Sequence, residues 1–137
     1  MLQLERNIAT LIRPIVKDGV SCVGLINKNG RLDEMVCNED LPLSKDKKEM
    51  FYMSIKFLSS MQSDFDAELQ PVYYNITERG DLKILTIPIG DRIVFSLMDK
   101  AENHIQVVEN LHNIFNNLEM FSHPSWLPVV AKSIECQ

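Results

Sequence analysis

The chain has 137 residues, 45% of them apolar, and this length is typical of one domain with a single core. Its 14 basic and 19 acidic side chains give a net charge of −5. That balance disfavours nucleic acid as a partner, because a binder of the phosphate backbone usually carries a positive patch. Charged residues interrupt the apolar N-terminus, so we expect no secretory signal, no membrane partner and a cytoplasmic location.

The first predicted element is a short helix, in which Leu4, Ile8, Leu11 and Ile12 follow helical spacing. Pro14 lacks an N–H and crowds the preceding turn, so this helix is expected to end or kink near residue 13.

Two apolar runs, VSCVGLI and RLDEMVC, come next and flank a turn. They predict a β-hairpin centred on Asn29-Gly30, because Asn-Gly readily adopts positive φ in a tight turn. Counting outward from that centre sets two pairs opposite each other, Lys28 with Arg31 and Cys22 with Cys37.

A long helix is predicted between residues 44 and 69, where the chain has no glycine and no proline. Ser44 or Asp46 can cap its start, and Pro71 marks the stop. Three strand candidates follow, VYYNIT, LKILTIP and RIVFSLM, and Gly-Asp pairs at 80–81 and 90–91 predict the reversals between them.

The tripeptide Arg79-Gly80-Asp81 can be a cell-adhesion ligand outside cells. For this chain we interpret it as a turn, because glycine supplies the backbone freedom that a reversal needs. Pro88 is expected at the end of its strand, where the missing N–H does no harm.

A final helix is predicted from Ala101 to Leu118, opened by a capping box formed by Asp99 and Glu102. The elements then predict an α+β fold in the order α-β-β-α-β-β-β-α, with one antiparallel five-stranded sheet and helices on its faces. We divide the chain into a domain over residues 1–120 and a C-terminal tail over 121–137 whose structure the sequence leaves open.

No catalytic, cofactor or metal site is predicted. Cys22, Cys37 and Cys136 are odd in number and have no C-x-x-C spacing, so we interpret them as buried or incidental thiols. The histidines at 104, 112 and 123 are expected at the surface, at helix ends or in a loop. The acidic residues at 64, 66 and 68 and the lysines at 45, 47 and 48 are interpreted as solvated faces, although the lysines also suit an acidic partner.

The long helix carries apolar side chains over roughly 200° of its circumference, whereas one buried face needs little more than about 100°. This excess predicts a second contact surface, since methionine and phenylalanine are enriched at protein interfaces. The alternative is that the N-terminal helix or the tail covers it. The predicted interface residues are Met50, Phe51, Met53, Phe57, Leu58, Met61 and Phe65.

The stretches GVSCVGLINKNGRL and DLKILTIPIGDRIVFSLMDKAENHIQVVENL resemble the opening hairpin and the last strands and helix of the roadblock/dynein light chain family, most closely small archaeal relatives. The resemblance covers residues 4–118. It implies a roadblock/profilin-like fold, a dimer through the long helix and the strand after it, and a platform associated with Ras-like GTPases, without enzymatic residues. The large residues of the long helix depart from the small residues usual in the family.

Three functions remain open from the sequence. The first is a non-enzymatic dimerising adaptor or scaffold, a homodimer through the long helix with a small GTPase as a possible partner. The second is a small-molecule sensor of the PAS or GAF type, since a sheet backed by helices can enclose a pocket. The third is an enzyme whose titratable groups only folding brings together.

Overall fold

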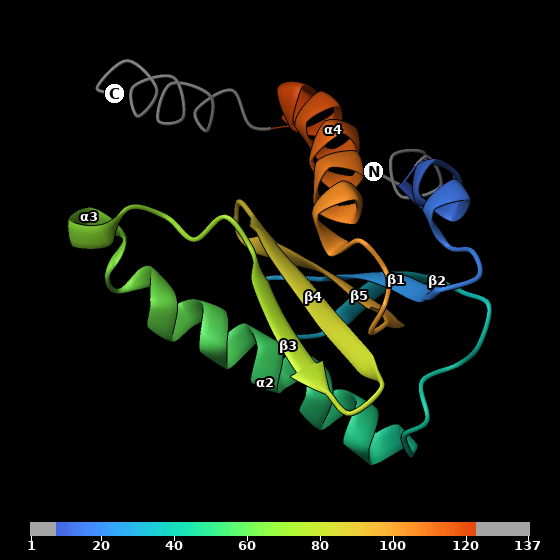
Figure 1. Cartoon of the computed structure of the whole chain (residues 1–137). Helices are drawn as coiled ribbons and strands as arrows, with labels where there is room; N and C mark the ends of the chain where they lie inside the picture. Colours follow the sequence, from blue (N-terminus) through green and yellow to red (C-terminus); the bar gives the residue numbers. More distant parts are fainter. Residues whose placement is uncertain (1–7, 123–137) are drawn as a thin grey trace.

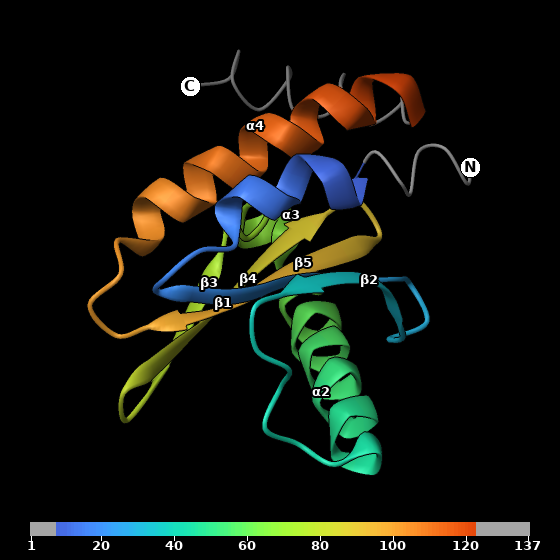
Figure 2. The same cartoon turned by 90° about the vertical axis from the view of Figure 1, so that its right-hand side faces the viewer.

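The computed structural model describes residues 8–122, the last five of them as backbone only. A sheet lies between two helical layers, with the long helix on one face and the first and last helices on the other (Figures 1 and 2). Residues 8–12 are helical, and the elements after them are η1 (Arg13–Ile15), β1 (Val20–Ile26), β2 (Leu32–Cys37), α2 (Lys45–Ser63), α3 (Asp66–Leu69), β3 (Asn75–Arg79), β4 (Leu82–Ile89), β5 (Arg92–Asp99) and α4 (His104–Ser122).

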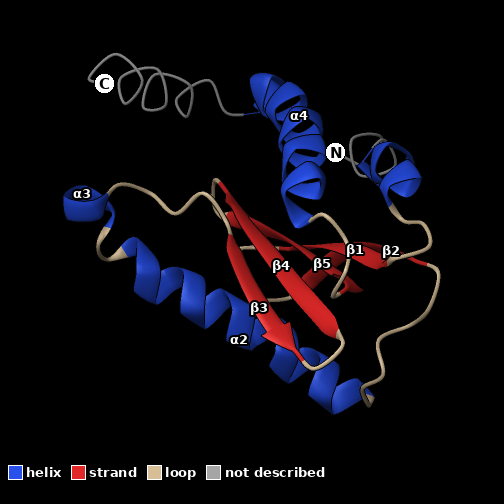
Figure 3. Ribbon diagram, in the orientation of Figure 1, coloured by secondary structure: helices blue, strands red, loops and turns tan. Residues whose placement is uncertain are grey.

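The five strands form one antiparallel sheet in the order β2-β1-β5-β4-β3. Figure 3 shows the sheet in red with helices on both sides. The predicted fold class, a single five-stranded antiparallel sheet with helices on its faces, is confirmed. β2 and β3 are the two edge strands, so each has one side without a sheet neighbour among the described residues.

Two apolar clusters hold the layers together, one on each face of the sheet. The larger cluster joins the sheet to the first helix and to α4, which contributes Val107, Val108, Leu111 and Phe115. The smaller cluster joins the sheet to α2 and contains Phe95 at its centre. The sheet backbone at Gly24 lies so close to the Phe95 ring that an added Cβ would overlap a ring carbon.

The β1–β2 hairpin turns one residue earlier than the sequence suggested. Asn27 pairs with Arg31 across a three-residue loop, and its side-chain oxygen accepts hydrogen bonds from the N–H groups of residues 29 and 31. The predicted pairing of Lys28 with Arg31 is therefore wrong. A bulge beyond residue 25 restores the register, so the predicted pairing of Cys22 with Cys37 is confirmed.

Two-residue turns join β3 to β4 and β4 to β5, as the Gly-Asp pairs predicted. Gly80 and Asp81 lie between the paired residues Arg79 and Leu82, and Gly80 has a φ of 49°. The adhesion-like tripeptide is thus part of a hairpin turn. Pro88 pairs with β5 on one side. On its other side, β3 begins only opposite residue 86. The N–H that proline lacks would therefore have had no hydrogen-bond acceptor on β3.

The two long helices differ from prediction at their ends. Ser44 caps α2 as expected, but α2 stops at Ser63 and α3 follows as a separate short helix. The predicted capping box, formed by Asp99 and Glu102, is wrong. Asn103 caps α4 instead by accepting from the N–H of Gln106, because the chain forms a turn at 99–102 before the helix begins. α4 continues to residue 122, and the remainder of the predicted tail lies outside the described residues.

Candidate interaction surface

The inner side of α2 packs on the sheet through few residues. Tyr52 and Ile55 are the buried side chains of this helix. The rings of Phe51 and Tyr52 each pack against the ring of Phe95, at centroid distances of 5.8 and 5.7 Å. At 100° per residue, Phe57 lies about 140° from Tyr52 and about 160° from Ile55 around the helix axis. The side of α2 that carries Phe57 therefore points away from the sheet.

That side of α2 is apolar and uncovered by the rest of the described chain. Met50, Phe57 and Met61 are 68%, 65% and 62% exposed, and they fall within about 40° of one another over a length of about 16 Å. Met53 and Leu58 are also exposed and flank this line. We call these five residues the outer face of α2. Figures 1 and 2 show no described helix or strand over it.

The two remaining predicted interface residues lie at the margins of the outer face. Phe51 is half-buried because its ring packs on Phe95. Phe65 is 58% exposed and lies after the end of α2, in the link to α3, where Leu69 is also exposed. Met53 contacts the β1–β2 turn, since a Cβ on Gly30 would meet its sulfur. The predicted residues other than Phe51 are thus exposed along α2 and in the link to α3.

The edge strand β3 is tied to the same helix. Gln62 near the end of α2 and Asn75 at the start of β3 exchange two amide hydrogen bonds of 2.8 and 2.9 Å. Thr77, Glu78 and Arg79 are exposed, and the outer side of β3 has no strand beside it in the described part of the chain. An apolar helix face and an open strand edge therefore belong to one firmly connected unit.

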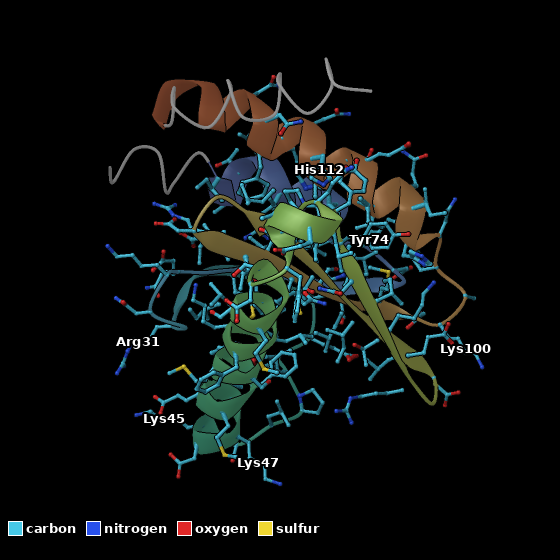
Figure 4. All side chains as sticks on the ribbon, turned by 90° about the vertical axis from the view of Figure 1, so that its left-hand side faces the viewer. Arg31, Lys45, Lys47, Tyr74, Lys100 and His112 are labelled. Atoms are coloured by element: carbon cyan, nitrogen blue, oxygen red, sulfur yellow. The ribbon has the colours of Figure 1, made fainter. Side chains whose placement is uncertain are left out.

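The lysines at the start of α2 are not equivalent. Lys48 donates to Asp40 over 2.7 Å, an interaction that lowers the pKa of that carboxyl and raises the pKa of the lysine. Lys45 and Lys47 are exposed and lie at the end of α2 that is farthest from α4 (Figure 4). The ion pair anchors the loop that leads into the helix.

His112 is not the simple surface residue that the sequence suggested. Its ring stacks on Tyr73 with centroids 4.4 Å apart and planes 7° apart, and it faces the segment before β3 that carries Tyr74 (Figure 4). Burial lowers its pKa below the ordinary 6.5, against a hydrogen bond to the Tyr73 backbone that raises it. Its Nε2 is enclosed and has no hydrogen-bond partner among the described residues. The sequence could not predict this contact, because Tyr73 and His112 are far apart along the chain and no local pattern links them.

A cavity of about 480 Å³ opens beside this stack, between the end of α2, the link to β3 and α4. Its polar lining comes from Ser59, Gln62, Ser63, Asp66, Tyr73, His112 and Asn116. The cavity lies at the end of the sheet, whereas the two faces of the sheet are filled by the apolar clusters.

Lys83 is a second feature that the sequence did not suggest. It lies on β4, is only 6% exposed, and its Nζ contacts the carbonyl oxygen of Glu102 at 2.6 Å and Nδ1 of His104 at 2.9 Å. These contacts satisfy a buried cation and attach the start of α4 to the sheet. We assign Lys83 and His104 a structural role.

The described part of the chain has no candidate metal centre. Residues 8–122 contain no group of three or more His, Cys, Asp or Glu side chains placed to hold a metal ion. His104 and His112 contact different partners, and His123 and Cys136 lie outside the described residues. None of the helices in this part of the chain has both the length and the apolar character needed to cross a membrane.

Comparisons with known proteins identify the fold through structure alone. No family model matches the sequence, and no curated protein matches it. A roadblock/LC7 domain from Streptomyces avermitilis superposes with a TM-score of 0.63 at 9% identity, over 88% of this chain and 96% of that one. MglB from Myxococcus xanthus gives 0.60 at 12% identity, over 81% and 96%. A structure described as MglB with tetrameric arrangement gives 0.68 at 7% identity, over 84% and 87%. The chain therefore has the roadblock/LC7 fold.

Proposed function

We propose that this chain is a non-enzymatic adaptor that forms a homodimer through the outer face of α2 and the open edge of β3. The outer face of α2 carries the proposal, because three large apolar side chains on one line are each more than 60% exposed. A second copy would bring the same line of Met and Phe side chains against it, as a two-fold axis requires. The neighbouring β3 edge would then supply backbone hydrogen bonds between copies.

The proposed partners follow from the fold and from the resemblance in sequence. One similar structure is of MglB in a tetrameric arrangement, which supports self-association of chains with this fold. The family resemblance supports a small Ras-like GTPase as the protein that the dimer binds, and a cytoplasmic location. The sensor alternative is not favoured, because the similar structures are roadblock/LC7 domains and MglB.

Light scattering on a sizing column tests the dimer directly. We expect a dimer at tens of micromolar for the unmodified chain, and a monomer for Phe57→Asp, because two aspartates would be buried without partners across the two-fold axis. Ile105→Asp is the matched control. Ile105 is also apolar and 56% exposed, but it lies on α4 on the opposite side of the sheet (Figure 1).

Two results would contradict the proposed dimer. One is a monomeric unmodified chain whose mass on the column is the same as that of Phe57→Asp. The other is a dimer that Ile105→Asp disrupts and Phe57→Asp does not, which would move the interface to α4. Circular dichroism of each variant shows that the fold is retained.

The GTPase partner needs a separate experiment. A Ras-like GTPase from the same organism, loaded with GDP or with a non-hydrolysable GTP analogue, is mixed with the chain and run on the same column. Co-elution in either nucleotide state supports the proposed partner. Separate elution of both proteins at tens of micromolar in both states contradicts it and leaves the dimer unaffected.

A further inference from the structure

A pair of cysteines lies on the sheet face that α2 covers, far from the β3 edge. Cys22 on β1 and Cys37 on β2 are directly opposite each other in the antiparallel register. Directly opposite residues point to the same face of a sheet, so both side chains project to one side. Both cysteines are free thiols in this structure.

The backbone hydrogen bonds define the kind of pair that these cysteines form. The N–H of Asn38 donates to the carbonyl oxygen of Ser21 over 2.9 Å, so Ser21 and Asn38 are a hydrogen-bonded pair. The next pair along, Cys22 and Cys37, is then a non-hydrogen-bonded pair, in which Cα atoms are about 4.5 Å apart. Disulfides join Cα atoms that are about 4.4–6.8 Å apart. The Cα separation typical of such a pair therefore falls within the range that disulfides join.

The two thiols differ in access to solvent. Cys37 is exposed on the edge strand, whereas Cys22 is fully buried in the cluster under α2 that also contains Leu41 and Tyr52. Burial raises the pKa of the Cys22 thiol to about 11, so it stays protonated at neutral pH. A dissolved oxidant can therefore reach the exposed Cys37 thiol, whereas the buried Cys22 thiol is shielded from it.

We propose that Cys22 and Cys37 are a redox-active dithiol, which a hydroperoxide converts to an intramolecular disulfide. The Cys37 thiolate attacks one peroxide oxygen, the O–O bond breaks, and Cys37 becomes a sulfenic acid as hydroxide leaves and is protonated to water. Cys22 then attacks the Cys37 sulfur, and its proton goes to the departing hydroxide. Two thiols and one hydrogen peroxide give one disulfide and two waters, with two electrons passing from sulfur to peroxide.

The test uses the whole chain with Cys136→Ser, so that the proposed pair are the only thiols. The reduced protein is treated with one equivalent of hydrogen peroxide, denatured and alkylated, and its mass is measured. We expect a loss of about 2 Da, no alkylation and a peptide that links Cys22 to Cys37, all reversed by dithiothreitol. Two alkylated thiols, or a covalent dimer joined through Cys37, would overturn the proposal.

Single variants in the same background test the order of the two steps. Cys37→Ser replaces an exposed residue, so folding is preserved, and the buried Cys22 should resist both peroxide and alkylation until the protein is denatured. Rapid oxidation of Cys22 in that variant would overturn the assigned roles. Cys22→Ser should stop the reaction at the Cys37 sulfenic acid, which dimedone traps. Its circular dichroism spectrum is checked first, and Cys37→Ser decides the result if this buried substitution does not fold.

Discussion

At the scale of single residues, the stack of Tyr73 on His112 shows how a polar side chain becomes partly buried by packing against an aromatic ring. The His112 ring lies between α4 and the link to β3 and loses part of its water. A charged imidazole would have to be desolvated there, so the folded state favours the neutral ring. The enclosed Nε2 has no partner in residues 8–122, so a proton on it would be a further cost unless a hydrogen-bond acceptor reached it.

The His112 environment makes folding stability sensitive to acid. The pKa of His112 is below its ordinary 6.5 in the folded chain, so the unfolded chain binds a proton first as the pH falls. The stability that His112 contributes is thus present above pH 6.5 and is lost as the pH falls through the lower folded pKa.

Urea unfolding at pH 7.5 and pH 5 measures this loss. We expect His112→Gln to lose less free energy of unfolding between the two pH values than the unmodified chain does. An equal loss in both proteins would show that other groups carry the acid sensitivity of the fold.

At the scale of elements, the edge strand β3 offers a test that separates backbone from side chain. Arg79 and Leu82 flank a two-residue turn, so the N–H of Arg79 points toward β4. N–H groups alternate along a strand, and that of Glu78 therefore points to the open edge. Proline at position 78 removes a donor from the open edge and leaves the ladder with β4 intact.

The variants Glu78→Pro and Glu78→Ala form a matched pair for the β3 edge. If the two copies join their sheets there, Glu78→Pro should weaken the dimer by roughly 1 kcal/mol or more, because a hydrogen bond between strands is lost twice. Glu78→Ala removes the same side chain and should leave the dimer unchanged. Sedimentation equilibrium measures both. Equal effects of the two variants would mean that the dimer uses α2 without the strand edge.

The helix α2 has an unusual balance for a surface helix. Two of its residues are buried on the sheet, fewer than the four that α4 buries among its first twelve. Its outer face exposes more large apolar side chains than its inner face covers. Because α2 buries only a small inner face on the sheet, covering its outer face would stabilise the helix further, since most helical stability comes from packing.

At the scale of the whole molecule, this balance links folding to association. A partner that binds the folded chain and not the unfolded chain stabilises it by mass action. We expect the melting temperature of the unmodified chain to rise as its concentration increases from about 5 to about 100 µM, and that of Phe57→Asp to stay constant. Differential scanning calorimetry at several concentrations measures this. A constant melting temperature in both proteins would show that the chain is stable alone and would count against the dimer.

The sequence alone determined the elements whose cause is local. These causes are helical spacing, Gly-Asp turns, a capping serine and alternating strands, and each depends on residues that are close together in the sequence. Together they predicted the order of elements and the antiparallel sheet. The apolar arc of the long helix also comes from spacing along one helix. The predicted residues are exposed on α2 and in the link after it, except Phe51, whose ring packs on Phe95.

The tertiary structure decided what depends on contacts between distant segments. The buried Lys83, which contacts Glu102 and His104, and the stack of Tyr73 on His112 join segments that are far apart in the sequence, so no single stretch encodes them. The same holds for the outer face of α2. Spacing shows how wide the apolar arc is, but only the folded chain shows which side the sheet covers and which side is left for a partner.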